Sequence, residues 1–267
     1  MFLNILTNVV VFLIGAAVGS FANVCIYRLP RYASVVHPGS MCPHCGTPIP
    51  FYDNIPVLSY ILLGARCRFC DGRINLRYPL IEVLVGVAAL WLFRSRGVSA
   101  TALYAFVLTV ALLIGSMIDL EHRIIPDVIS VSGIWIGLTI AAFAGGLNLT
   151  WWVSFKQAVV GAALGWGLLW SVGKAYEWIS GREGIGFGDV KLLALFGAHG
   201  GISGVLVALF YGSLVGSVVG VGLMAFYRKG RRYPIPFGPF LCLGFAIWAL
   251  FGQRAIDVPL SRFLGTP

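Results

Sequence analysis

Long apolar stretches alternate with short polar ones along most of the 267-residue chain. The apolar stretches lie at residues 5–26, 79–93, 101–118, 128–146, 156–174, 190–199, 202–226 and 237–251. A helix that crosses the hydrocarbon core of a membrane needs about 20 predominantly apolar residues. The pattern therefore predicts an all-α polytopic membrane protein with about eight transmembrane segments. A hydrophobic content of 58% and a charged content of 11% agree with this, because few water-soluble domains carry so few charges.

Two of these stretches need separate interpretation. Residues 190–199 would form a helix of only about 15 Å, so we expect a partial span or a re-entrant segment that other protein covers. Residues 5–26 have no basic leader before their apolar core and no clear cleavage site of small residues. We therefore interpret them as a retained first helix and not as a signal peptide.

The basic residues are distributed unevenly between the loops. With residues 27–78 placed in the cytoplasm and eight alternating spans, fourteen of the 19 Lys and Arg residues face the cytoplasm and five face the other side. This bias follows the positive-inside rule and predicts that both termini lie outside the cytoplasm. Anionic lipid head groups account for the net charge of +9, so no nucleic-acid partner is needed.

The polar insertion at residues 27–78 contains two Cys-x-x-Cys pairs. Cys42 and Cys45 form the first, and Cys67 and Cys70 form the second, 21 residues further along. Four thiolates in two such pairs suit one tetrahedral Zn²⁺, which can fold a loop too small for its own hydrophobic core. The alternative is two disulfides or free redox thiols, which a reducing cytoplasm disfavours. We expect a structural zinc module, and we expect the isolated Cys25 and Cys242 to be buried, inert thiols.

An acid stands at the start of an apolar run in "GFGDVKLLA", residues 186–194. Asp189 is able to cap a helix there, but capping does not explain the flanking glycines. A second acidic stretch, "IDLEHRIIPD" at residues 118–127, lies between two apolar runs. Asp119 ends the first run, and Asp127 begins the next, where it resembles a helix-start acid.

Two carboxylates held close together in a partly dry site do not both ionise easily and tend to share one proton. One then takes a proton from water while the other donates to a carbonyl oxygen or a leaving amine, as in aspartic proteolysis. An acid at the boundary of water and lipid also lies within reach of a substrate embedded in the membrane. Lys191 follows Asp189 by two residues. Its positive charge is placed to favour the ionised form of Asp189 and so to counteract such proton sharing.

Taken together, these residues resemble the bacterial type IV prepilin peptidases, also called leader peptidase and N-methyltransferase enzymes, which are membrane aspartic proteases with a Gly-x-Gly-Asp motif. The resemblance covers most of the chain. It rests on both acidic stretches, on the paired cysteines, and on "GSFANVCIYRLP" at 19–30, "NIPVLSYILLGARCRFC" at 54–70 and "RYPLIE" at 77–82.

The resemblance implies cleavage of the leader peptide from prepilins or pseudopilins at the cytoplasmic face of the bacterial inner membrane. It further implies methylation of the new N-terminal residue with S-adenosylmethionine as the methyl donor. By position in the motifs, Asp119 and Asp189 are the catalytic pair and the four loop cysteines bind zinc. The chain then divides into a first transmembrane helix (1–26), a cytoplasmic loop with the zinc module (27–78) and a membrane-embedded aspartic peptidase domain (79–267).

The site of the methyl donor is not located by the sequence. No glycine fingerprint of a Rossmann fold is present. Glu82, just inside an apolar run, has either a functional role or the role of an interfacial helix-start acid.

Two other functions remain possible from the residues. A proton-coupled transporter with a zinc-stabilised cytoplasmic loop also carries intramembrane acids and glycine-rich, broken helices. It usually shows internal repeats, and none is detected here. A zinc-binding module on a membrane anchor is the other alternative, but it leaves the paired acids unexplained.

Overall fold

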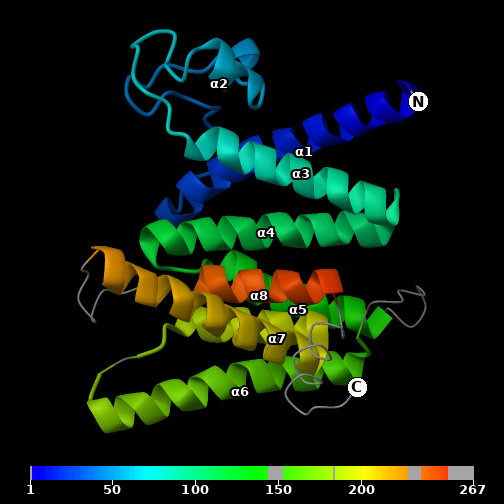
Figure 1. The fold of residues 1–267 in the computed structure, drawn as a ribbon, viewed down its shortest axis with the longest axis vertical. Helices are drawn as coiled ribbons and strands as arrows, with labels where there is room; N and C mark the ends of the chain where they lie inside the picture. Colours follow the sequence, from blue (N-terminus) through cyan, green and yellow to red (C-terminus); the bar gives the residue numbers. More distant parts are fainter. Residues whose placement is uncertain (1, 144–152, 183, 228–235, 252–267) are drawn as a thin grey trace. The chain divides into compact units, whose positions relative to one another are not determined.

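The computed structural model describes residues 2–143, 153–182, 184–227 and 236–251, which form helices joined by loops (Figure 1). The long helices are α1 (Phe2–Arg28), α3 (Arg77–Arg96), α4 (Ala100–His122), α5 (Asp127–Phe143), α6 (Phe155–Ser180), α7 (Phe187–Tyr227) and α8 (Gly238–Phe251). Between α1 and α3 lie the short elements η1 (Leu29–Arg31), η2 (Phe51–Asp53) and α2 (Leu58–Leu62). The described residues form isolated β-bridges but no named strand. The prediction of an all-α protein is confirmed.

Five of these helices, α1, α3, α4, α6 and α7, are long and apolar enough to cross a membrane, and α5 and α8 are shorter apolar helices. The predicted count of eight segments is not confirmed, because only five helices among the described residues have the length and composition of a span. Residues 190–199 and 202–226 lie on either side of a break within α7. Two predictions rest partly on residues outside the described ranges. One predicted segment ends with positions 144–146, which are among them. The orientation was assigned partly from six such basic residues, namely Arg228, Lys229, Arg231, Arg232, Arg254 and Arg262.

The chain divides into two compact units, residues 1–114 and 115–267, and each is described by itself. In the first unit, α1 and α3 pack with their backbones very close together. A Cβ atom on Gly19 would lie 2.8 Å from Cα of Glu82, and one on Gly15 would lie 2.9 Å from Cα of Gly86. Small residues at these positions permit the close approach, as is common between membrane helices.

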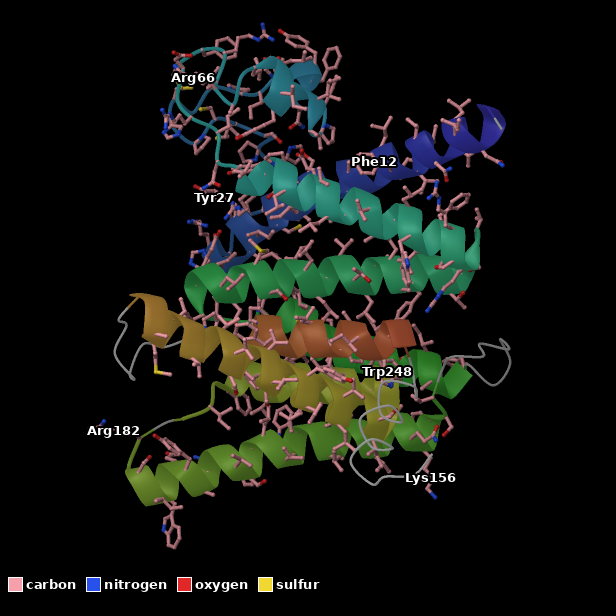
Figure 2. The ribbon with its side chains drawn as sticks, viewed as in Figure 1. Phe12, Tyr27, Arg66, Lys156, Arg182 and Trp248 are labelled. Atoms are coloured by element: carbon pink, nitrogen blue, oxygen red, sulfur yellow. The ribbon has the colours of Figure 1, made fainter. Side chains whose placement is uncertain are left out.

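In the second unit, α6 packs against the beginning of α7 through glycines. A Cβ atom on Gly161 would lie 2.5 Å from the carbonyl oxygen of Gly197. One turn further along α6, Gly165 contacts the backbone of Leu193 in the same way. Later residues of α6 thus contact earlier residues of α7, so the two segments run antiparallel. Polar residues mark the two ends of α6, where Figure 2 shows Lys156 and Arg182.

Helix α7 is broken at Gly201, which has φ 60° and ψ −155°. An L-amino acid with a side chain rarely adopts this backbone conformation, so glycine is needed at the break. A Cβ atom on Gly204 would lie 3.1 Å from the carbonyl oxygen of Phe196, eight residues earlier, so the chain turns back on itself (Figure 1). Every residue from 192 to 200 is buried. The expectation that other protein covers this segment is therefore confirmed for residues 192–199, while its nature as a partial span or a re-entrant segment stays a prediction.

Candidate functional site

Asp119 lies in the last turn of α4 and is buried, with 6% of its surface exposed. Its carboxylate atom Oδ2 accepts a hydrogen bond of 3.1 Å from the backbone N–H of Gly238, the first residue of α8. A helix N-terminus has free N–H groups and a partial positive charge, so it suits an acidic side chain. The end of α4 and the start of α8 together fix the direction in which Asp119 points.

Asp189 is the third residue of α7 and does not cap it, because the helix already begins at Phe187. Gly188 explains part of the glycine-rich motif. A Cβ atom there would lie 3.3 Å from Cβ of Ile125, in the link between α4 and α5. The small residue allows α7 to start close to the end of α4. A Cβ atom on Gly238, whose N–H donates to Asp119, would lie 3.1 Å from Cδ1 of the same Ile125. The starts of α7 and α8, next to Asp189 and Asp119, therefore both pack on Ile125.

Asp127 does not join this pair. It begins α5, as expected, and its Oδ1 atom accepts a hydrogen bond of 2.6 Å from Nζ of Lys191. Lys191 was expected to be able to act on Asp189, but its ammonium group is instead held by Asp127 in a salt bridge. The structure thus gives two of the three candidate acids to one site and pairs the third with a lysine.

Cys242 in α8 is the residue near the two acids that the sequence did not single out. It is buried, as expected, but both Asp119 and Asp189 act on it electrostatically, and Ser116 of α4 forms a hydrogen bond with it. Its thiol therefore belongs to the wall of the site. No motif surrounds Cys242 in the sequence, so only the packing of α8 against α4 and α7 reveals this position.

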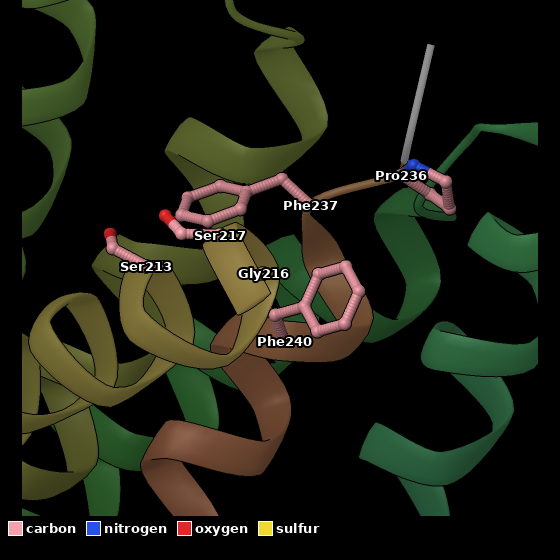
Figure 3. A pocket seen from close by; sticks show the side chains of 6 residues that line it. All are labelled: Ser213, Gly216, Ser217, Pro236, Phe237 and Phe240. Atoms are coloured by element: carbon pink, nitrogen blue, oxygen red, sulfur yellow. The ribbon is translucent and has the colours of Figure 1, made fainter. Parts of the chain in front are cut away.

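A cavity of about 280 Å³ lies between the end of α7 and the start of α8. Figure 3 shows the residues that line it: Ser213, Gly216, Ser217, Pro236, Phe237 and Phe240. Phe237 directly precedes Gly238, the residue that donates to Asp119. The cavity combines two aromatic rings with small and hydroxylated residues. Such a lining suits a mainly apolar side chain.

The four loop cysteines meet in the first unit. The sulfur atoms of Cys42, Cys45, Cys67 and Cys70 all lie within 4.8 Å of one another, and Sγ of Cys42 is 3.8 Å from Sγ of Cys70. A tetrahedral Zn²⁺ with Zn–S bonds of about 2.3 Å places its sulfur ligands about 3.8 Å apart. The donor set and its spacing therefore fit a zinc ion.

The two cysteine pairs have the same local backbone structure. The N–H of Cys42 donates to the carbonyl of Thr47 at 3.0 Å, and that of Cys67 donates to the carbonyl of Gly72 at 2.9 Å. Each pair is thus closed by the same turn, which directs both sulfurs inward. Nε2 of His44, a possible competing ligand, lies 3.2 Å from the carbonyl oxygen of Arg73 and is not part of the sulfur cluster.

Local hydrogen bonds favour the thiolate form, which a metal requires, at two of the four clustered cysteines, Cys45 and Cys67. The hydroxyl group and the backbone of Thr47 lower the pKa of Cys45 to about 6. Backbone N–H groups of Phe69 and Cys70 lower the pKa of Cys67 as well. Because a zinc ligand must lose its proton, these bonds prepare the loop for metal binding.

Two families match most of the chain between them. The bacterial peptidase A24 N-terminal domain matches residues 13–95, and the type IV leader peptidase family matches residues 106–221. The first match contains the cysteine cluster, and the second contains both Asp119 and Asp189.

Similar proteins from several bacteria carry the name prepilin leader peptidase/N-methyltransferase. The one from Pseudomonas putida is 37% identical over 263 residues, which cover 90% of this chain and 89% of the relative. The one from Aeromonas hydrophila is 35% identical over 278 residues, covering 95% and 94%. The one from Pseudomonas aeruginosa is 35% identical over 265 residues, covering 91% and 89%. No solved structure matches the chain. The transporter alternative has no support in these matches.

Proposed function

The chain belongs to the type IV leader peptidase family, and from that premise we propose that it cleaves the leader peptide of type IV prepilins or pseudopilins and N-methylates the new N-terminal residue. It is an enzyme of the bacterial inner membrane that passes the membrane several times. The observation that supports the peptidase assignment is that the start of α7, which carries Asp189, and the start of α8, which donates to Asp119, both pack on Ile125 within the second unit.

Asp119 and Asp189 are the catalytic pair in this proposal. The ionised member takes a proton from a water molecule, whose oxygen attacks the carbonyl carbon of the scissile peptide bond. The protonated member donates to the carbonyl oxygen, and a proton then passes to the leaving amine. The Gly238 N–H fixes the Asp119 carboxylate for this exchange. In this proposal the cavity lined by Phe237 and Phe240 receives an apolar side chain of the substrate.

Methylation requires S-adenosylmethionine, which supplies a methyl group on a positively charged sulfur. Cys42, Cys45, Cys67 and Cys70 hold a structural zinc ion in this proposal, because their sulfurs have the spacing of a tetrahedral site. The zinc stabilises a loop that contributes few buried apolar residues of its own.

The loop and the catalytic pair face the cytoplasm, and both termini lie in the periplasm, according to the charge bias. The exposed Cys45 provides a test. In intact spheroplasts treated with a chelator, a membrane-impermeant maleimide is expected to leave Cys45 unlabelled, and lysis is expected to permit labelling. Labelling of Cys45 before lysis would show that the loop lies on the periplasmic side, which is opposite to the proposed orientation.

The central experiment compares three isosteric variants of the purified enzyme. Asp119→Asn and Asp189→Asn should each lower the rate of prepilin cleavage by at least about a hundredfold, because a general acid–base group is lost. Asp127→Asn is the matched control and should change the rate by less than about tenfold, since Asp127 is paired with Lys191. Mass spectrometry of the product N-terminus measures cleavage and methylation separately. Full cleavage by Asp119→Asn or by Asp189→Asn would refute the catalytic pair.

A further inference from the structure

Glu82 is a buried carboxylate that the peptidase mechanism does not use. It lies in α3, faces Gly19 of α1, and exposes only 8% of its surface. Its Oε2 atom accepts a hydrogen bond of 2.7 Å from the backbone N–H of Val57, and the hydroxyl of Ser20 donates a second. Within the described part of the chain it forms no salt bridge. An ionised carboxylate without a cation is costly at such a position.

Asn23 lies one helical turn from Gly19 in the same seam between α1 and α3. It exposes 3% of its surface, and its Nδ2 atom donates to the carbonyls of Gly19 at 3.3 Å and Tyr78 at 3.1 Å. Its other polar atom, Oδ1, is buried and has no hydrogen-bond partner among the described residues. Buried acceptors are rarely left unsatisfied in folded proteins. The seam thus holds one buried amide oxygen without a donor and one carboxylate that accepts two hydrogen bonds but has no cation among the described residues.

Val57 connects this seam to the cysteine loop. Its backbone has φ 62° and ψ −48°, which is strained for a β-branched residue. The N–H that this strained residue directs at Glu82 holds the loop against α3. Strained backbone of this kind recurs in binding sites, where the surrounding structure maintains it. The cysteine loop and the buried acid therefore form one local arrangement within the first unit.

We propose that Glu82 and Asn23 bind a primary ammonium group of a methylation substrate. An ammonium group offers three N–H donors and one positive charge, which match an unpaired carboxylate and an unpartnered amide oxygen. This inference rests on the proposed function, because N-methylation supplies two such groups. One is the amino-acid end of S-adenosylmethionine, and the other is the new N-terminus of the cleaved substrate. Both molecules present the same ammonium group, and the experiment below identifies which of the two Glu82 binds.

The test uses Glu82→Gln in the full-length enzyme, because glutamine keeps the size of the side chain and an acceptor for the Val57 N–H but removes the charge. Glu177→Gln is the matched control, since Glu177 is an exposed acid paired with Lys174. Equilibrium dialysis measures the affinity of radiolabelled S-adenosylmethionine and of a peptide that begins at the new N-terminus. Two probes without the ammonium group, methylthioadenosine and the acetylated peptide, serve as negative probes.

Glu82→Gln should weaken one ammonium-bearing probe by at least about tenfold, as expected for the loss of a charge-assisted hydrogen bond. The probe that weakens identifies the source. Methylthioadenosine and the acetylated peptide should bind the variant and the wild type equally, and Glu177→Gln should behave as wild type. Unchanged affinity for both ammonium-bearing probes, or binding of neither by the wild type, would overturn the proposal and make Glu82 a structural clamp for Val57.

A second measurement needs no variant and therefore does not depend on the folding of Glu82→Gln. Dicyclohexylcarbodiimide modifies buried carboxylic acids, and mass spectrometry quantifies the adduct at Glu82 in the wild-type enzyme. The bound probe should protect Glu82 and leave the modification of Asp119 unchanged. Equal modification of Glu82 with and without both probes would contradict the proposal. Prepilin cleavage by the wild-type enzyme is measured in parallel. Absence of that cleavage would reveal failure of the peptidase assignment, which is thereby distinct from failure of the present proposal.

Discussion

The backbone N–H of Gly238 donates a 3.1 Å hydrogen bond to Oδ2 of Asp119, across 119 residues of sequence. This bond joins the start of α8 to the end of α4 at the carboxylate site. A Cβ atom on Gly238 would lie only 2.6 Å from the same oxygen and 3.1 Å from Cδ1 of Ile125. The position therefore accepts no side chain unless Asp119 moves.

Gly238→Ala should lower the rate of prepilin cleavage by about tenfold or more, because small displacements of a positioned catalytic group are costly. The matched control is Gly222→Ala in α7, where an added Cβ atom meets nothing within 4 Å. That variant should cleave at the wild-type rate. Initial rates on a purified prepilin compare the two. Equal rates for both variants would show that the Gly238 contact does not position Asp119.

Zinc binding should depend on the loop cysteines alone. Purified wild-type protein should contain about one zinc per chain, as measured by inductively coupled plasma mass spectrometry, since four clustered thiolates form one closed site. Cys67→Ser should lose the zinc. Cys25→Ser, which changes a buried cysteine outside the cluster, should retain it. Zinc in Cys67→Ser at the wild-type level would contradict the assignment of the ligands.

The sequence predicted the helices well because a chain in lipid must satisfy its backbone internally, which requires continuous apolar helices. It also placed a boundary between residues 190–199 and 202–226, and the structure breaks α7 there, at Gly201. The segment "GAHGG" offers several glycines at which a helix can break, and only the positive φ of Gly201 identifies the one used.

The candidate site was predictable only in part. The motifs that contain Asp119 and Asp189 indicated both acids, and the structure brings them into one site, while their catalytic roles stay a prediction. The contact of Gly238 with Asp119 and the place of Cys242 beside both acids depend on the packing of α8. No local pattern carries this information. For Lys191 the sequence distance to Asp189 was misleading, since the side chain reaches Asp127 instead.

The glycines of α6 provide a test of the packing that holds the second unit together. Gly161→Ala would put a Cβ atom 2.5 Å from the carbonyl oxygen of Gly197, and backbone on both sides has little room to shift. Overpacking of this kind costs about 1–3 kcal/mol, so the apparent Tm in detergent should fall by about 3–10 °C. Gly167→Ala in the same helix meets nothing within 4 Å and should keep or slightly raise the Tm. A Tm for Gly161→Ala equal to that of Gly167→Ala would exclude close packing here.

The reactivity of Cys45 should depend on pH through Thr47. The hydroxyl group and the backbone of Thr47 hold the pKa of Cys45 at about 6 in the metal-free loop, so most of this thiol is ionised at pH 7. Thr47→Val removes the hydroxyl and should move the pKa up towards the ordinary value of about 8.5. Since only the thiolate reacts with iodoacetamide, the alkylation rate of the metal-free variant at pH 7 should fall by about threefold or more.

The wild-type alkylation rate should fall as the pH drops through about 6, whereas the midpoint for Thr47→Val should lie at higher pH. Mass spectrometry of the peptide that contains Cys45 measures the rate after chelation of zinc. The alkylation of free cysteine added to the same reaction serves as the internal reference, because its pKa does not depend on Thr47. If both proteins share one midpoint, the Thr47 hydroxyl does not stabilise the thiolate, and the ionisation of this ligand must be driven by the metal itself.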